Sequence, residues 1–198
     1  MYEYISGKIA SATATQVVID CGGVGYLLEV SLNTYAAVKE QATVRLWVHE
    51  IVREDAYLLY GFATVDEREM FRLLLSVSGV GAATARIMLS SLTVSELASA
   101  ISTQNAKVVQ GVKGIGAKTA QRIILELKDK VVGGQLVDVI NQSSPASGQQ
   151  SSFTQNKADA QAALVMLGFP KPAVEKVLRD IDSTLSVEQI MKQAMQRL

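Results

Sequence analysis

The sequence has few of the residues that form covalent or metal cross-links. Cysteine and histidine occur once each among 198 residues, as Cys21 and His49. One of each cannot form a disulfide, or a zinc site of thiolates and imidazoles, within the chain. We therefore expect no disulfide and no metal. The fold must depend on hydrophobic cores, for which 48% hydrophobic residues supply ample material.

Long apolar runs are also missing. No stretch of the sequence approaches the ~20 apolar residues that span a bilayer. The residues after Met1 contain no basic segment that leads into an apolar one, as a signal peptide would. We expect a soluble, cytoplasmic protein with no membrane partner.

A charge excess of either sign is absent as well, since 19 Lys and Arg side chains balance 19 Asp and Glu. The total gives no indication of a nucleic-acid partner, whose usual mark is a basic excess. The distribution is more informative, because residues 1–62 carry a net charge of −3, residues 63–135 carry +3 and residues 136–198 carry zero. A solvated helical face explains such a basic segment equally well, so a DNA-binding interpretation needs a second feature in the same place.

Residues 1–62 show the pattern of short strands. Five runs rich in Val, Ile, Leu, Thr and Tyr are separated by glycines and turns. We expect strands over residues 4–10, 15–20, 26–30, 43–49 and 57–60. A short helix over residues 34–39, capped by Asn33, falls between the third and fourth strands. Five strands with one helix at this point are typical of a small closed β barrel of the OB type.

The pattern becomes helical after residue 62. We expect five short helices joined by tight turns, over residues 66–76, 82–90, 94–102, 105–110 and 117–130. Asp66 with Glu69, and Thr93 with Glu96, have the spacing of N-terminal capping boxes. Residues 63–134 are therefore expected to form a second, helical domain, which makes the chain a multidomain α+β protein.

The composition changes again beyond Gly133. Residues 135–156 contain no Lys or Arg and are rich in Ser and Gln, so they bury too little apolar surface to order themselves. We expect them to be a flexible linker. Residues 157–198 then fit a compact bundle of three short helices, the last of them capped by Ser186 with Gln189.

An internal repeat lies in the basic part of the chain. Residues 77–85 (VSGVGAATA) align with residues 112–120 (VKGIGAKTA) at a constant offset of 35, and six of the nine positions are identical. A glycine turn that runs into the start of a helix points N–H groups outward with the helix dipole behind them, which suits an anion. Two such turns can hold phosphates of a nucleic-acid backbone without reading a base. The turns are Gly79-Val80-Gly81 and Gly114-Ile115-Gly116.

Two basic side chains follow the second turn. Lys118 and Arg122 lie four residues apart on one face of the predicted helix, where they add charge to the phosphate contact. The first copy has Ala83 in place of Lys118, so its turn is expected to bind through backbone amides alone and more weakly. The second turn nearly matches the phosphate loop of ATPases. However, Ala117 separates the glycine from the lysine and no strand precedes the turn, which argues against an ATPase site.

The tandem glycine turns resemble the helix-hairpin-helix motif of DNA proteins that bind without sequence specificity. Over its whole length, the chain is similar to the RuvA family of bacterial Holliday junction-binding proteins. The similarity rests on both turns and on residues 22–26, 52–56, 58–62 and 163–169. It implies an OB-fold barrel, a double helix-hairpin-helix domain and a third domain that docks on the hexameric ATPase motor RuvB.

The resemblance also implies roles for particular residues. Glu54 and Asp55 match the family's acidic pin, which lies at the centre of a fourfold assembly and repels phosphates where DNA strands part. Leu164, Leu167 and Phe169 match the segment that docks on the motor. The core of a three-helix bundle is the alternative for these three, and for Leu164 the spacing supports it equally well.

The protein that this resemblance implies is a non-catalytic subunit without a cofactor. It recognises four-way junctions for branch migration in recombination and repair. Its implied partners are four-way junction DNA, RuvB and the RuvC resolvase, and its implied assembly is a homotetramer or an octamer on DNA.

Two other functions remain open at this point. Helix-hairpin-helix folds also occur in glycosylases, which need a catalytic Lys or Asp in a pocket, and in nucleases, which need a carboxylate cluster for a metal. Neither set is apparent, although Asp129 lies after the second turn. In the second alternative, the main function belongs to the C-terminal bundle, which acts as a protein-interaction module similar to ubiquitin-associated (UBA) domains.

Overall fold

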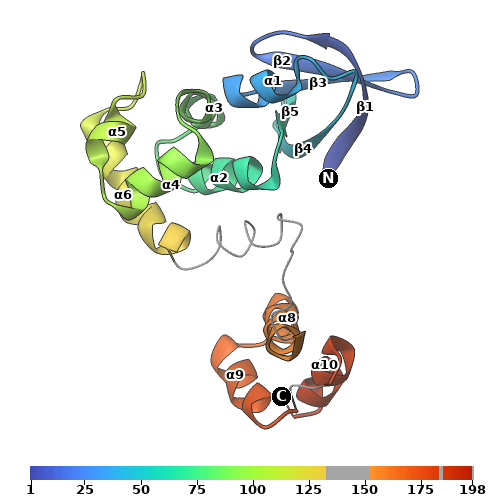
Figure 1. Cartoon of the computed structure of the whole chain (residues 1–198). Coiled ribbons are helices and arrows are strands. Elements are labelled where there is room, and N and C mark those ends of the chain that lie inside the picture. The colour runs from blue at the N-terminus through green and yellow to red at the C-terminus, as the bar shows by residue number, and fades with distance from the viewer. Residues whose placement is uncertain (133–151, 183–184, 198) are drawn as a thin grey trace. The chain divides into compact units, whose positions relative to one another are not determined.

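The computed structural model of the chain describes residues 1–132, 152–182 and 185–197 (Figure 1). These residues form two compact units, one before the first gap and one after it. None of the helices in the described ranges combines the length and the apolar character that crossing a bilayer requires.

A closed five-stranded barrel begins the first unit (Figure 1). Its strands are β1 (Tyr4–Ala12), β2 (Gln16–Cys21), β3 (Val24–Val30), β4 (Thr43–Val52) and β5 (Tyr57–Phe62). They follow the order β1-β2-β3-β5-β4, in which β3 and β5 are parallel and the other neighbours are antiparallel. Helix α1 (Leu32–Val38) connects β3 to β4. The predicted OB barrel, with one helix after its third strand, is confirmed.

Alternate residues of the strands fill the barrel. In β4, Val44, Leu46 and Val48 are buried in the barrel core. This period of two is that of a strand with one face on a core. Trp47 and His49, on the opposite face of β4, are half-buried and pack against the helices that follow.

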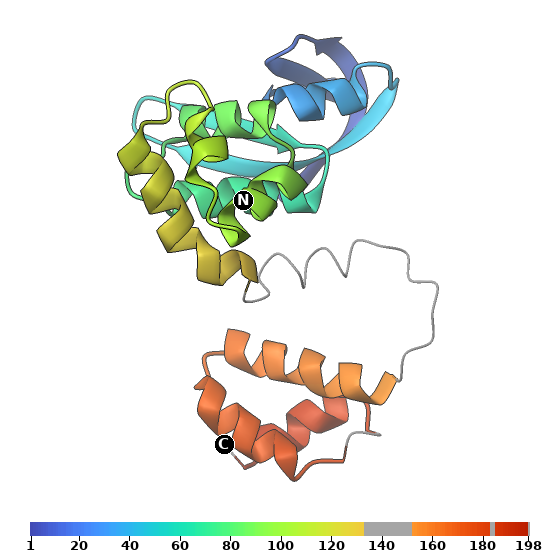
Figure 2. The same ribbon diagram turned by 60° about the vertical axis from the view of Figure 1, so that its left-hand side comes forward.

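Five helices complete the first unit: α2 (Val65–Leu75), α3 (Ala82–Ser91), α4 (Val94–Ser102), α5 (Ala106–Gln110) and α6 (Ala117–Val132). α2 and α3 lie next to the barrel, whereas α5 and α6 lie farther from the barrel, beyond α2 and α3 (Figures 1 and 2). Phe71 of α2 is fully buried. Its ring centroid lies 4.9 Å from that of Phe62 and 5.1 Å from that of Tyr60, both on β5. The boundary predicted at residue 62 therefore falls inside a hydrophobic core that barrel and helices share.

A buried carboxylate also joins the barrel to α2. The two carboxylate oxygens of Glu67 accept hydrogen bonds from the hydroxyls of Ser31 and Thr34, at 2.5 and 2.6 Å, and all three residues are buried. Thr34 Oγ1 in turn accepts from the backbone N–H of Ala63, 3.0 Å away, in the two-residue connection between β5 and α2. Because each oxygen of the carboxylate has a partner, this polar cluster fixes the passage from barrel to helices.

Two of the predicted helix caps are wrong. α1 is capped by Ser31 rather than Asn33, because the side-chain amide of Asn33 donates instead to two carbonyls at the end of α3. α2 is capped by Thr64, whose hydroxyl accepts from the N–H three residues on, rather than by Asp66. The capping boxes predicted at Thr93 and at Ser186 are both confirmed.

His49 lies between the barrel and α2. Its ring is edge-on to Phe71, with 5.5 Å between the ring centroids. Burial lowers the pKa of His49 below its usual 6.5, and the charges of Arg72 and Arg68 lower it further, while two nearby carboxylates raise it. The unfolded chain therefore takes up this proton before the folded chain does as the pH falls.

We expect the free energy of unfolding to decrease below pH 6.5, and part of that decrease to come from His49. The stabilising effect of a neutral His49 is fully present above this pH. It is lost as the pH falls from 6.5 through the lower pKa of the folded chain, because the unfolded state binds more protons in this range. The variant His49→Gln should show a flatter dependence between about pH 7 and pH 5, measured by urea unfolding at each pH. A slope equal to that of the unsubstituted chain would contradict this prediction.

The second unit is a bundle of three helices, α8 (Ser152–Met166), α9 (Lys171–Arg179) and α10 (Val187–Met195). α8 begins five residues before the predicted start of the bundle, so residues 152–156 of the predicted linker are helical. The side-chain amide of Asn156 donates to the carbonyl of Leu185, which ties this turn to the bundle although its polar sequence shows no helical pattern. The remainder of the predicted linker, residues 135–151, lies outside the described residues.

Candidate nucleic-acid interface

The two glycine turns have the same backbone geometry. The first joins α2 to α3, and the second joins α5 to α6. Gly79 has φ +90° and Gly114 has φ +91°, values that favour glycine. Equivalent positions donate equivalent backbone hydrogen bonds: Val80 to Val77 at 3.0 Å, Ile115 to Val112 at 3.1 Å, and both Ala85 to Gly81 and Ala120 to Gly116 at 2.9 Å. The repeat in the sequence is therefore also a repeat in the structure.

Each turn is anchored by its central apolar residue and open at its second glycine. Val80 and Ile115 are each 6% exposed and belong to the core of the helical region. Gly81 and Gly116 are exposed, and a Cβ atom placed on either would meet no heavy atom within 4 Å. The helices that start there, α3 and α6, begin with N–H groups that have no intrahelical acceptor. The turns thus present backbone donors to solvent, as an anion site requires.

The cations are distributed unequally between the two turns. Lys118, after the second turn, is exposed, and so is its uncharged counterpart Ala83 after the first. Arg122 also follows the second turn, on α6, but its guanidinium reaches the first turn, where Nη1 donates to the carbonyl of Ser78 at 3.0 Å. The predicted contact residues thus lie at both turns. The hydrogen bond from Arg122 to Ser78 connects α6, the helix after the second turn, to the first turn.

Lys130, two helical turns further along α6, reaches the end of α2, just before the first turn. Its Nζ donates to the hydroxyl of Ser76 at 3.0 Å. Sequence reasoning did not include Lys130 in the interface, because this contact joins positions 54 apart. The spacing of eight residues from Arg122, about two turns of one helix face, is the one sequence signal that relates the two.

The acidic pair lies on a tight β-hairpin. Glu54 and Asp55 are exposed in the connection between β4 and β5, which the N–H of Arg53 closes by donating to the carbonyl of Ala56 at 2.8 Å. The ion pairs found among the described residues involve other carboxylates. Two adjacent negative charges therefore project into solvent from the same compact unit that contains the glycine turns.

The three residues predicted to dock on a motor differ in their exposure. Leu164 is fully buried in the core of the second unit, whereas Leu167 is 60% exposed and Phe169 is half-buried. Gly168 between them has φ +97° and ends α8: its N–H donates to Val165, and that of Phe169 donates to Leu164. The structure thus places Leu164 in the core of the bundle, in agreement with its alternative interpretation, and leaves Leu167 and Phe169 accessible at its surface.

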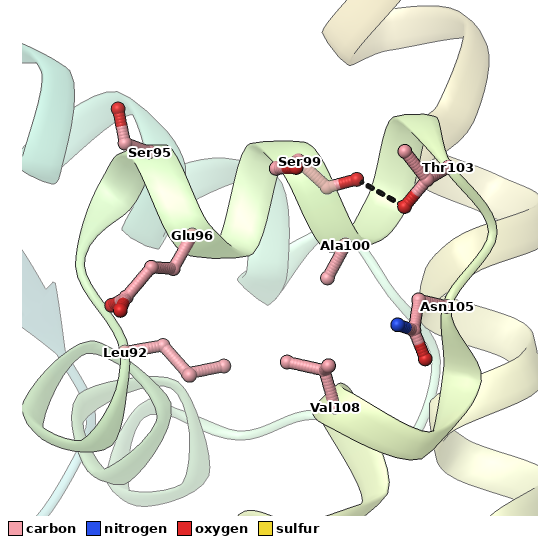
Figure 3. Close-up of a pocket in the computed structure, with 8 residues that line it drawn as sticks. All are labelled: Leu92, Ser95, Glu96, Ser99, Ala100, Thr103, Asn105 and Val108. Atoms are coloured by element: carbon pink, nitrogen blue, oxygen red, sulfur yellow. Dashed lines mark hydrogen bonds between the residues drawn. The ribbon is translucent and has the colours of Figure 1, made fainter.

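A shallow pocket of about 440 Å³ lies between α4 and α5 (Figure 3). Its lining is uncharged apart from Glu96. That carboxylate accepts hydrogen bonds from the N–H and the hydroxyl of Thr93, both at 2.8 Å, and these bonds lower the pKa of Glu96. Glu96 therefore acts as a helix cap, and the lining offers no nucleophile–base pair of the kind that an enzyme needs. Across the described ranges, His, Cys, Asp and Glu form no group of three or more that could hold a metal ion, and Asp129 is exposed on α6.

An OB barrel followed by two glycine turns of one geometry places this chain in the class of DNA-binding proteins with helix-hairpin-helix motifs. Three family models match this chain: "RuvA N terminal domain" over residues 1–61, "SAM-like Helix-hairpin-helix tandem" over residues 71–129 and "RuvA, C-terminal domain" over residues 155–198. The chain belongs to the RuvA family, as the resemblance of its motifs implied.

Relatives of full length support this assignment. The chain is 47% identical to a protein of Parabacteroides distasonis over 201 residues, 46% to one of Porphyromonas gingivalis over 202 and 45% to one of Bacteroides thetaiotaomicron over 201. Each alignment covers 100% of this chain and 100% of the relative. All three relatives are named "Holliday junction branch migration complex subunit RuvA".

Proposed function

We propose that this chain is the junction-binding subunit of a bacterial branch-migration complex. It holds a four-way DNA junction through the phosphate backbone, keeps the junction open and catalyses no reaction by itself. The observation that carries this proposal is the pair of turns at residues 79–81 and 114–116, which share one backbone geometry and present N–H donors to solvent. The name that the relatives share supports it.

Attraction and repulsion of phosphate belong to different parts of the first unit. The turns and the cations of α6 attract phosphates, whereas Glu54 and Asp55 repel them. In a homotetramer with fourfold symmetry, four such acidic pairs surround one axis, at the point where the strands of a junction separate. A second tetramer on the opposite face of the DNA makes an octamer, and a mass measurement with and without junction DNA distinguishes the two assemblies.

The second unit recruits the motor in this proposal. The motor is the hexameric ATPase RuvB, so the whole complex is an ATP-dependent helicase although this subunit needs no cofactor. Leu167 and Phe169 offer the apolar contact. The RuvC resolvase is the further partner on the same junction, and the complex works in the bacterial cytoplasm.

A gel-shift series at one fixed salt concentration tests junction recognition. The probes are a four-way junction and a linear duplex that contains the same sequences. We expect the junction to bind at least about tenfold more tightly, a difference of about 1.4 kcal/mol in binding free energy. Equal affinity for the two probes would overturn the proposal, and DNA cleavage or base release by the chain alone in Mg²⁺ would favour the enzyme alternative.

The same series separates the role of the acidic pair from that of the turns. In the double variant Glu54→Gln with Asp55→Asn, the size of the side chains is kept while their negative charge is removed. We expect this variant to bind linear duplex more tightly and thus to prefer the junction less, because the repulsion of continuous DNA is lost. If the variant prefers the junction over linear duplex as strongly as the unsubstituted chain does, the acidic pair does not act as a pin.

A further inference from the structure

The first glycine turn lacks the cations that follow the second. At the offset of 35 residues, Ala83 corresponds to Lys118 and Ile87 corresponds to Arg122. Ile87 is 44% exposed, so an apolar side chain stands at the surface where the second copy has a guanidinium. The chemistry of a phosphate site is therefore incomplete in the first copy of the repeat.

The basic residue within α3 does not fill this gap. Arg86 is ion-paired with Glu29 and also donates to the carbonyl of Thr15, both in the barrel region. Its side chain is about three-quarters buried there. Arg86 therefore ties α3 to the barrel and is not available to the turn.

Arg122, on the helix that follows the second turn, supplies a cation at the first turn instead. Arg122 Nη1 donates to the carbonyl of Ser78, and a Cβ atom placed on Gly79 would lie 3.9 Å from the same nitrogen. The guanidinium thus lies against the backbone of the first turn. Lys130 strengthens the attachment, since its Nζ donates to Ser76 just before that turn.

The guanidinium keeps donors for a ligand after making this contact. An Arg side chain has five N–H donors in a planar fork, and the carbonyl of Ser78 takes one of them. The nearest carboxylate is that of Glu126, with 3.9 Å between Arg122 Nε and Glu126 Oε1. The side chain of Arg122 is 52% exposed. One guanidinium can therefore hold the turn and donate to a phosphate oxygen at the same time.

We infer that Arg122 supplies the cationic contact of the first turn's phosphate site, in place of a basic residue that position 83 lacks. This inference rests on the proposed function, because it assumes that both turns bind phosphodiesters. Lys118 serves the second turn and Arg122 serves the first. One helix, α6, then carries the charged contacts for both turns, so a shift of α6 changes both phosphate sites together.

A charge-relocation experiment tests the assignment. The variant Arg122→Gln removes the charge and keeps a polar side chain, and Lys118→Gln is its counterpart at the second turn. We expect each variant to bind a four-way junction roughly tenfold more weakly. Each should also lower the slope of log affinity against log salt by about 0.9. Thermal unfolding checks that the variants are folded.

The decisive step places a lysine at the exposed position 83. We expect Ala83→Lys to restore most of the affinity that Arg122→Gln loses, and little of the affinity that Lys118→Gln loses. In the unsubstituted chain, where Arg122 already completes the site, Ala83→Lys should change affinity less than about twofold. Ser95→Lys adds the same charge at an exposed position of α4, outside both turns, and measures how far an added charge alone changes the affinity.

Two outcomes would overturn the inference. One is that Ala83→Lys restores both glutamine variants equally, or neither of them. The other is that it tightens the unsubstituted chain as much as it tightens the Arg122→Gln variant. In either case the unsubstituted chain still prefers the junction over linear duplex if the proposed function holds, so that comparison separates a failure of this inference from a failure of the function.

Discussion

Replacing Phe71 with alanine is expected to destabilise the whole first unit. The side chain is fully buried, and its ring packs against Phe62, Tyr60 and His49. Removing a buried Phe side chain costs about 3–5 kcal/mol of unfolding free energy. For a unit of this size, the midpoint of thermal unfolding should fall by on the order of 10 °C. Calorimetry or circular dichroism measures the shift.

The same experiment tests whether barrel and helices unfold together. Because they share one core, the Phe71→Ala variant should lose strand and helix signals in a single transition. Leu125→Ala is the matched control, since Leu125 is 80% exposed and its truncation should change stability by less than about 0.5 kcal/mol. If Phe71→Ala does not fold, Phe71→Leu is measured instead, because it removes less buried side chain and should lower the unfolding free energy less. Separate transitions for strand and helix signals would contradict the shared core.

Deleting the second unit is expected to separate DNA binding from recruitment of the motor. A chain that ends at residue 151 retains the barrel, both glycine turns and the acidic pair, so its affinity for a four-way junction should stay within about twofold. Branch migration that depends on ATP and RuvB should be lost, because the proposed docking surface is gone. Gel shifts measure the first property, and conversion of a junction into duplex products measures the second.

Point variants distinguish loss of a contact from loss of the unit. Leu167→Asp introduces a charge at a side chain that is 60% exposed, so it should abolish stimulation of the motor without unfolding the bundle. Ala162→Asp, at an exposed position on α8, the helix that ends just before Leu167, is the control and should retain stimulation. Loss of junction binding in the deleted chain would show that the second unit contributes to the DNA interface and would overturn this division of roles.

The features that sequence analysis predicted correctly depend on local spacing. The strands are visible because buried residues recur at every second position, as at Val44, Leu46 and Val48. The paired turns are visible because the same glycines recur after 35 residues. The capping boxes at Thr93 and Ser186 are visible because each involves residues three apart.

The features that it missed depend on contacts between distant positions. Asn33 is of a residue type that caps helices, but its side-chain amide donates to a carbonyl 56 residues away. Arg122 is near the second turn in sequence, and its contact with Ser78 joins positions 44 apart. The resemblance gives Leu164 a docking role, and its spacing supports a place in the bundle core equally well. Only the packing of three helices around it decides between the two.

The two-residue connection between β5 and α2 has a mechanical consequence. β5 starts at the acidic hairpin and ends in the core around Phe71, and Ala63 in the connection is hydrogen-bonded to Thr34. Within these described residues, therefore, no flexible joint separates the acidic hairpin from the helix that leads into the first glycine turn. In the proposed function, the acidic pair and the first turn then keep a fixed spacing, and the energy of any distortion is taken up by the DNA. Junctions whose arms bend easily at the crossover should be accommodated at the lowest energy.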